Sequence, residues 1–206
     1  MAFRWVPRRE LSGTDALSKW VDRMDFSLTA KAFEHVMRVY GPVEVDRFAA
    51  AHNHKLPRFN TKFDTPGSEG VDALAQDWRT ASSFVLADFN LLDRVLDIIE
   101  RDDATAILIV PEWEQRPFWK RVRSSAWRRR VVAEEFLDRA ELVPNPENAD
   151  HCFLEGRPFR HRLLVMRVEP ILQLAAADMT GVASTAPAPA AARTPHRGSA
   201  SMGAHH

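Results

Sequence analysis

The stretch 104-ATAILIVP-111 is the sequence feature that most constrains the fold. It carries no charged side chain and is apolar at nearly every position, so both faces of a strand formed by it need cover. Continuous apolar strands of this kind are typical of the interior of a parallel sheet that has helices on both faces. The residues just before it predict one such helix, because apolar side chains recur at helical spacing over 91–101.

The rest of the chain alternates helical and strand patterns. Further strands are predicted at 3–9, 43–49, 83–89, 131–137 and 161–169. Helices are predicted after Ser12 or Thr14, from Ser27 or Thr29 to Gly41, and over 71–78 and 116–130. The polar range 52–70 is predicted to be a long loop. This order indicates an α/β, Rossmann-like fold: a mostly parallel sheet with helices on both faces and a C-terminal antiparallel strand.

The charge balance and the cysteine content exclude several classes of protein. Lys plus Arg and Asp plus Glu are equal at 28 each, so there is no net charge to draw the whole chain onto a polyanion. Cys152 is the only cysteine, which excludes an intramolecular disulfide and every zinc site built from several cysteines. Because 1-MAFRWVPRRE-10 has no apolar secretion signal and the apolar runs are short, we expect an intracellular protein of the cytoplasm or nucleus, without membrane contact.

Asp46 and Asn53 are the first candidate binding residues. Asp46 lies in the predicted strand 43–49, and Asn53 follows in the loop after it. In open α/β sheets, ligands bind beyond the carboxyl ends of the strands, where an acidic side chain accepts hydrogen bonds from a ribose or an ammonium group. The alternative is that Asp46 only turns the chain out of the strand. No glycine-rich phosphate loop follows the strand, so a pyrophosphate site is disfavoured.

Three ordered segments carry a resemblance to a known family. They are 43-VEVDRFAAAHNHKLPRFNTKFDTPGSEGVDALAQDW-78, 84-FVLADFNLLDRVLDII-99 and 105-TAILIVPEWEQRPFW-119. Together they resemble the region after reverse transcriptase and RNase H in DIRS-like and related tyrosine-recombinase retroelements, which is similar to Dam-like DNA adenine methyltransferases. The resemblance covers roughly residues 36 to 125. It implies a methyltransferase-like domain over 25–172, with S-adenosylmethionine as the cofactor of an active form and Asp46, Phe48 and Asn53 at its pocket.

The catalytic motif of that family is incomplete in this chain. Amino methyltransferases of this type carry Asn/Asp-Pro-Pro-Tyr/Phe at the position that reads Asp88, Phe89 and Asn90 here. The acidic and aromatic groups are present, but both prolines are missing. Because the motif must hold its hydrogen-bond acceptors ready for the target amino group, the resemblance implies impaired catalysis and no bound cofactor.

The two ends of the chain are expected to lie outside this domain. The range 1–24 resembles the end of a retroelement RNase H domain, in which Asp15 would be one of the metal-binding carboxylates. A lone carboxylate cannot hold two magnesium ions, so Asp15 is interpreted as a residue at the start of a helix. The range 173–206 is rich in Ala and Pro and is expected to be disordered.

The segment 119-WKRVRSSAWRRR-130 is the strongest candidate for nucleic-acid contact. Basic side chains can follow the phosphates of DNA or RNA, and an aromatic ring can stack on an unpaired base. The candidate residues are Trp113, Lys120, Arg121, Arg123, Arg128, Arg129 and Arg130. The alternative is an amphipathic helix that buries Trp119, Val122 and Ala126 and exposes its arginines to solvent.

Three hypotheses on function follow. The favoured one is a retroelement-derived, catalytically impaired Dam-like domain associated with nucleic acid. The second is an active S-adenosylmethionine-dependent DNA adenine methyltransferase, and the third is a ligand-free interaction or scaffold domain. His52 and His54 lack a third ligand at a regular spacing, so no metal site is predicted, and no oligomeric state is predicted either.

Overall fold

The computed structural model describes residues 26–138, 141–144 and 160–171 of the chain. Its strands are β1 (Phe26–Leu28), β2 (Val45–Ala49), β3 (Arg58–Thr61), β4 (Gly70–Val71), β5 (Ser83–Val85), β6 (Ala106–Pro111), β7 (Val131–Leu137), β8 (Leu142–Pro144) and β9 (Leu163–Val168). Its helices are α2 (Ala30–Tyr40), α3 (Leu92–Arg101), α4 (Pro117–Val122) and α5 (Ser125–Arg128), with short 3-10 turns η2 (Ala73–Ala75) and η3 (Phe89–Leu91). Several predictions concern residues outside these ranges: the strand 3–9, the first helix, the remnant 1–24, the whole tail 173–206 and Cys152.

The main sheet has seven strands in the order β4-β3-β2-β5-β6-β9-β7. The five strands from β4 to β6 run parallel, and β9 lies antiparallel between β6 and β7. The predicted α/β class, the mostly parallel sheet and the C-terminal antiparallel strand are therefore confirmed. A second, two-stranded sheet pairs β1 with β8, which lies far along the chain.

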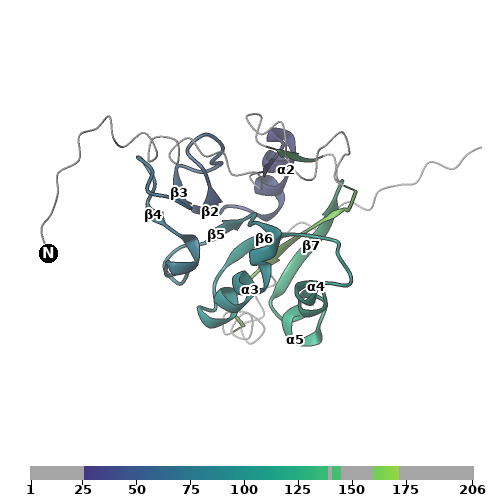
Figure 1. Ribbon diagram of the computed structural model, residues 1–206. Coiled ribbons are helices and arrows are strands. Elements are labelled where there is room, and N and C mark those ends of the chain that lie inside the picture. The colour runs from purple at the N-terminus through teal and green to yellow at the C-terminus, as the bar shows by residue number, and fades with distance from the viewer. Residues whose placement is uncertain (1–25, 139–140, 145–159, 172–206) are drawn as a thin grey trace, which may run out of the picture.

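Helices cover both faces of the main sheet, as the apolar run of β6 predicted. Every residue of β6 is buried. The aligned positions Asp46, Phe84, Ile107 and Arg167 lie on one face. α2 covers this face, because the Arg167 guanidinium donates to the carbonyl of Tyr40 at 2.7 Å and the ring of Phe33 meets Phe84 edge-on. Helices α3, α4 and α5 lie on the other side of the sheet (Figure 1).

The predicted loop 52–70 was wrong in part, because it contains β3 and the beginning of β4. The strand 58-RFNT-61 shows no apolar run, since Asn60 and Thr61 are buried through hydrogen bonds and not through apolar contacts. Asn60 accepts from the buried guanidinium of Arg47 at 3.0 Å, and that guanidinium also donates to Ser83 at 2.9 Å. A polar network thus joins β3, β2 and β5 within the sheet.

The single helix predicted over 116–130 was also wrong. It is broken into α4 and α5, because the hydroxyl oxygen of Ser124 accepts from the backbone N–H of Trp127 and starts a new turn. The new turn buries Trp127 and leaves Ala126 exposed, whereas Trp119 and Val122 are buried as expected. The predicted strand 83–89 likewise ends early, at Val85.

Candidate functional site

The order of the strands places a crevice at the ends of β2 and β5. From β2 the chain moves outward through β3 to β4, then returns to β5 on the other side of β2 and continues to β6. The loops that follow β2 and β5 therefore leave the sheet in opposite directions. In open α/β sheets, such a switch point is where ligands bind, outside the carboxyl ends of the strands.

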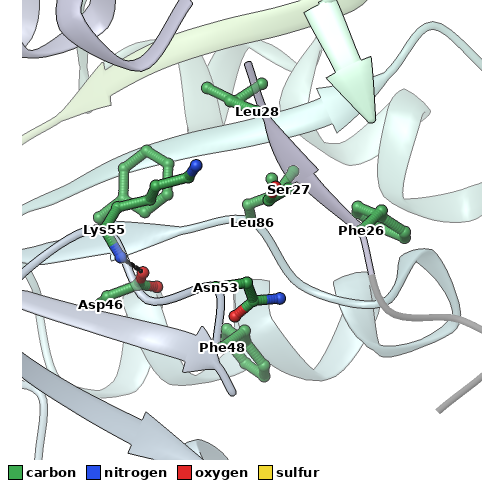
Figure 2. Close-up of a pocket in the computed structure, with 9 residues that line it drawn as sticks. Phe26, Ser27, Leu28, Asp46, Phe48, Asn53, Lys55 and Leu86 are labelled. Carbon is green, nitrogen blue, oxygen red and sulfur yellow. Dashed lines mark hydrogen bonds between the residues drawn. The ribbon is translucent and has the colours of Figure 1, made fainter. Parts of the chain in front are cut away.

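A small pocket, with room of about 10 Å³, lies at this switch point (Figure 2). It is lined by Phe26, Ser27, Leu28, Asp46, Phe48, Asn53, Lys55, Phe84 and Leu86. The structure thus brings together the three residues that the sequence assigned to a cofactor pocket: Asp46, Phe48 and Asn53. The other walls come from β1, from β5 and the residue that follows it, and from Lys55 in the loop after β2.

Asp46 is the buried charge of the pocket. Its side chain comes from β2, is only 4% exposed, and accepts from the backbone N–H of Lys55 at 2.9 Å. Burial raises the pKa of Asp46 to about 6, although the backbone N–H groups of Lys55 and Phe48 act in the opposite direction. The carboxylate therefore holds the loop after β2 in place, as the alternative interpretation expected, and it also faces the pocket.

Phe48 and Asn53 shape the pocket beside Asp46. The carbonyl oxygen of the Asn53 side chain accepts from the backbone N–H of Ala50 at 2.7 Å, which closes the turn after β2. The partly buried ring of Phe48 packs edge-on against Trp78, with ring centroids 6.2 Å apart. Both side chains are thus fixed by local contacts of their own.

Asp88, Phe89 and Asn90 follow β5 at the same end of the sheet, but they do not line the pocket. One carboxylate oxygen of Asp88 accepts from the backbone N–H of Asn90 at 3.0 Å and from its side-chain amide at 3.1 Å. Asp88 thereby caps η3. Phe89 is buried between Phe26 and Trp113, with ring centroids 4.7 and 5.2 Å away. The motif position is therefore occupied by a capped turn and a core aromatic ring.

Four arginines of the basic segment are engaged in ion pairs. Arg121 of α4 binds Asp97 and Glu100 of α3, both at 2.6 Å. Arg123 and Arg128 both bind Glu134 of β7. Arg130 is buried and binds Asp103. These arginines hold α4 and α5 against the sheet and α3.

Lys120 and Arg129 are the exceptions in the basic segment. Both are exposed, and within the described part of the chain neither has an acidic side chain at ion-pair distance. Trp113, the remaining nucleic-acid candidate, lies just beyond β6. It is partly buried against Phe89, Phe118 and His161, and the guanidinium of Arg116 lies 5.7 Å from its ring.

The wall formed by β1 was not predicted from the sequence. Ser27 was considered only as a helix cap, and Phe26 and Leu28 were assigned no role. The structure caps α2 with Thr29, whose hydroxyl oxygen accepts from Ala32 at 3.1 Å, and this leaves the three preceding residues to form a strand over the pocket. The sequence offered no local signal for this, since the partner strand β8 lies more than a hundred residues away.

Among residues 26–138, 141–144 and 160–171, no three His, Cys, Asp or Glu side chains gather in a way that could hold a metal ion. Within the same residues, no helix combines the length and the apolar character needed to cross a membrane. Neither the known protein families nor the curated proteins gave a match to this sequence.

Proposed function

We propose that this chain is a methyltransferase-like domain that keeps a pocket for an adenosyl ligand but is impaired in methyl transfer. The observation that carries the proposal is the position of Asp46, a buried carboxylate in a pocket at the switch point of the sheet. A carboxylate in this place accepts hydrogen bonds from sugar hydroxyls or from an ammonium group. S-adenosylmethionine offers both kinds of donor.

The loop after β2 supports a ligand without a pyrophosphate. The range 50–57 reads AAHNHKLP and contains no glycine, so the backbone there cannot form the usual phosphate cradle. Asp46 would also repel a phosphate group. Among the common ligands of such sheets, an adenosyl group linked to an amino acid fits this chemistry better than a dinucleotide does.

The state of the motif after β5 supports impaired catalysis. The carboxylate of Asp88 caps η3, and Phe89 is packed into the core, so neither is placed to receive a target base. An active DNA adenine methyltransferase, the second hypothesis, would need both groups released. A ligand-free scaffold, the third hypothesis, would need no carboxylate facing the space between the ends of β2 and β5, where Asp46 lies.

Calorimetric titration of the full chain with S-adenosylmethionine and S-adenosylhomocysteine tests the proposal. We expect saturable binding that Asp46→Asn weakens at least tenfold and that Asp93→Asn, an exposed carboxylate of α3, leaves unchanged. We also expect no methylation of single- or double-stranded DNA. Absence of binding, or equal binding by the Asp46→Asn variant, would overturn the pocket assignment, and methylated DNA would establish the active enzyme.

We further propose that the domain is of retroelement origin and associates with nucleic acid. The origin is supported by the ordered resemblance of residues 36 to 125, and the association by the exposed Lys120 and Arg129. Reverse transcriptase and RNase H motifs in frame directly upstream of the coding sequence would support the origin. A complete upstream gene of another kind would contradict it.

A further inference from the structure

β1 is a wall of the pocket that stands outside the main sheet. Among the described residues it pairs with β8, through Phe26 with Pro144, Ser27 with Val143 and Leu28 with Leu142. Just after it, Thr29 donates its backbone N–H to the carbonyl of Glu141 at 2.9 Å, and its hydroxyl also bonds the Glu141 carboxylate. A short pairing with β8 is thus the main backbone anchor of this segment.

β1 lies over the pocket, opposite the groups proposed to bind the ligand. Figure 2 shows Ser27 and Leu28 on one side of the pocket and Asp46, Phe48 and Asn53 on the other. Leu28 is fully buried, and Phe26 packs its ring on Phe89. β1 therefore lies over Asp46 and covers the ring of Phe89.

A small-molecule ligand can enter the pocket only if one wall moves. The pocket has room of about 10 Å³, which is enough for roughly one water molecule and far too little for a small-molecule ligand. The walls from β2 and β5 belong to the centre of the seven-stranded sheet, where each strand has a neighbour on both sides. Moving either would break the main sheet. Moving β1 breaks its pairing with β8 and the apolar contacts of Phe26 and Leu28, but it leaves the main sheet intact.

We propose that β1 is a strap, clamped by β8, that closes the pocket and must leave β8 before a ligand can enter. The identity of the ligand rests on the function proposed above, but the gating does not. The apparent association constant for a ligand is then the intrinsic constant multiplied by the fraction of molecules whose strap is open. Changes in β8, outside the pocket, should therefore alter ligand binding.

The strap can be tested without a ligand by measuring access to the pocket wall. Leu86→Cys places a thiol in the pocket, and Cys152→Ser removes the native one. Val143→Pro then loosens β8 at a residue that does not line the pocket, and Val143→Thr is the matched control that keeps the strand. We expect a small thiol reagent to label the introduced pocket thiol at least tenfold faster with Val143→Pro than with Val143→Thr. Protection of the β6 amides from hydrogen exchange shows that both variants are folded. Equal labelling rates in two folded variants would overturn the strap.

The opposite change locks the strap. Ser27 and Val143 are direct partners in the β1–β8 register, so Ser27→Cys with Val143→Cys in the Cys152→Ser background can form a disulfide across them. We expect the oxidised protein to lose binding of S-adenosylhomocysteine and the reduced protein to regain it. Equal binding in both forms would refute the strap while leaving the proposed function intact. Faster labelling of the introduced pocket thiol with no binding by any variant would refute the proposed ligand while leaving the strap intact.

Discussion

At the scale of the residue, the burial of the Asp46 carboxyl group has a free-energy cost. Its carboxylate is almost fully removed from water and is held by backbone N–H groups, with no ion pair to a basic side chain among the described residues. Burying a charge without a close counter-ion is unfavourable, which is why burial raises its pKa to about 6. Such a cost is typical of residues that serve a site, because a purely structural turn could be held by a neutral side chain.

The burial of Asp46 should make the free energy of unfolding depend on pH. Below about pH 4, Asp46 is protonated in both the folded and the unfolded chain. Between about pH 4 and pH 6 only the folded protein keeps the proton, so the free energy of unfolding falls as the pH rises and levels off above pH 6. The loss is on the order of 3 kcal/mol. Urea unfolding across this range should show that the free energy of unfolding falls in the wild-type protein and falls less in Asp46→Asn. Identical pH profiles for the two proteins would contradict this prediction.

At the scale of the element, α4 and α5 show how ion pairs restrict a basic surface. Of the six basic side chains in this segment, Arg121, Arg123, Arg128 and Arg130 already bind carboxylates. Removing them would release acidic partners and loosen the helices from α3 and β7. Substitutions at Arg128 and Arg130 would therefore mix loss of stability with loss of binding, which makes Lys120 and Arg129 the residues to vary.

The salt dependence of DNA binding should follow from the number of free cations. Each phosphate contact on duplex DNA contributes about −0.9 to the slope of log affinity against log salt concentration, so two free cations predict a slope of about −2 and six would predict about −5. DNA binding measured by fluorescence anisotropy at several salt concentrations should give the slope of about −2. The double substitution Lys120→Ala with Arg129→Ala should bring this slope closer to zero. Arg94→Ala, which removes an exposed arginine of α3, is the control. A slope near −5, or one that the double substitution does not change, would rule out this surface.

The elements that the sequence predicted well are those whose apolar pattern matches their burial. In α3 and β6 every buried position is an apolar residue, so periodicity alone locates them. β3 was not predicted because Asn60 and Thr61 are buried by hydrogen bonding. Asp46 and Asn53 could be singled out because they lie in or just after a recognisable strand, and Phe48 was assigned through the family resemblance. The wall from β1 could not, since it depends on pairing with a strand that is distant in sequence.

At the scale of the whole molecule, the two sheets should differ greatly in stability. β6 lies between β5 and β9, is buried throughout, and pairs with β9 at six positions. The β1–β8 sheet has three paired positions and, in the part of the chain that the structure describes, only two strands. Opening of the small sheet therefore breaks few backbone pairs and the apolar contacts of one short strand, whereas opening of the central strands requires the main core to unfold.

Native-state hydrogen exchange should separate the two sheets. We expect amides of β6 and β9 to exchange only through global unfolding, so their free energy of exchange should fall steeply as denaturant is added. Amides of β1 should exchange through a local opening, whose free energy denaturant hardly changes. Exchange can be followed residue by residue with NMR. Equal free energies of exchange in β1 and β6 would show that the two sheets open as one unit.

The position of β9 has a consequence for synthesis of the chain on the ribosome. β6 and β7 are made first, yet neither pairs with the other, because β9 lies between them and is the last strand described. At about 5–20 residues per second, the nascent chain spends seconds with both of these strands lacking their shared partner. Unpaired apolar edges attract other strands, so a chaperone at the ribosome exit should engage this protein until residue 168 has emerged.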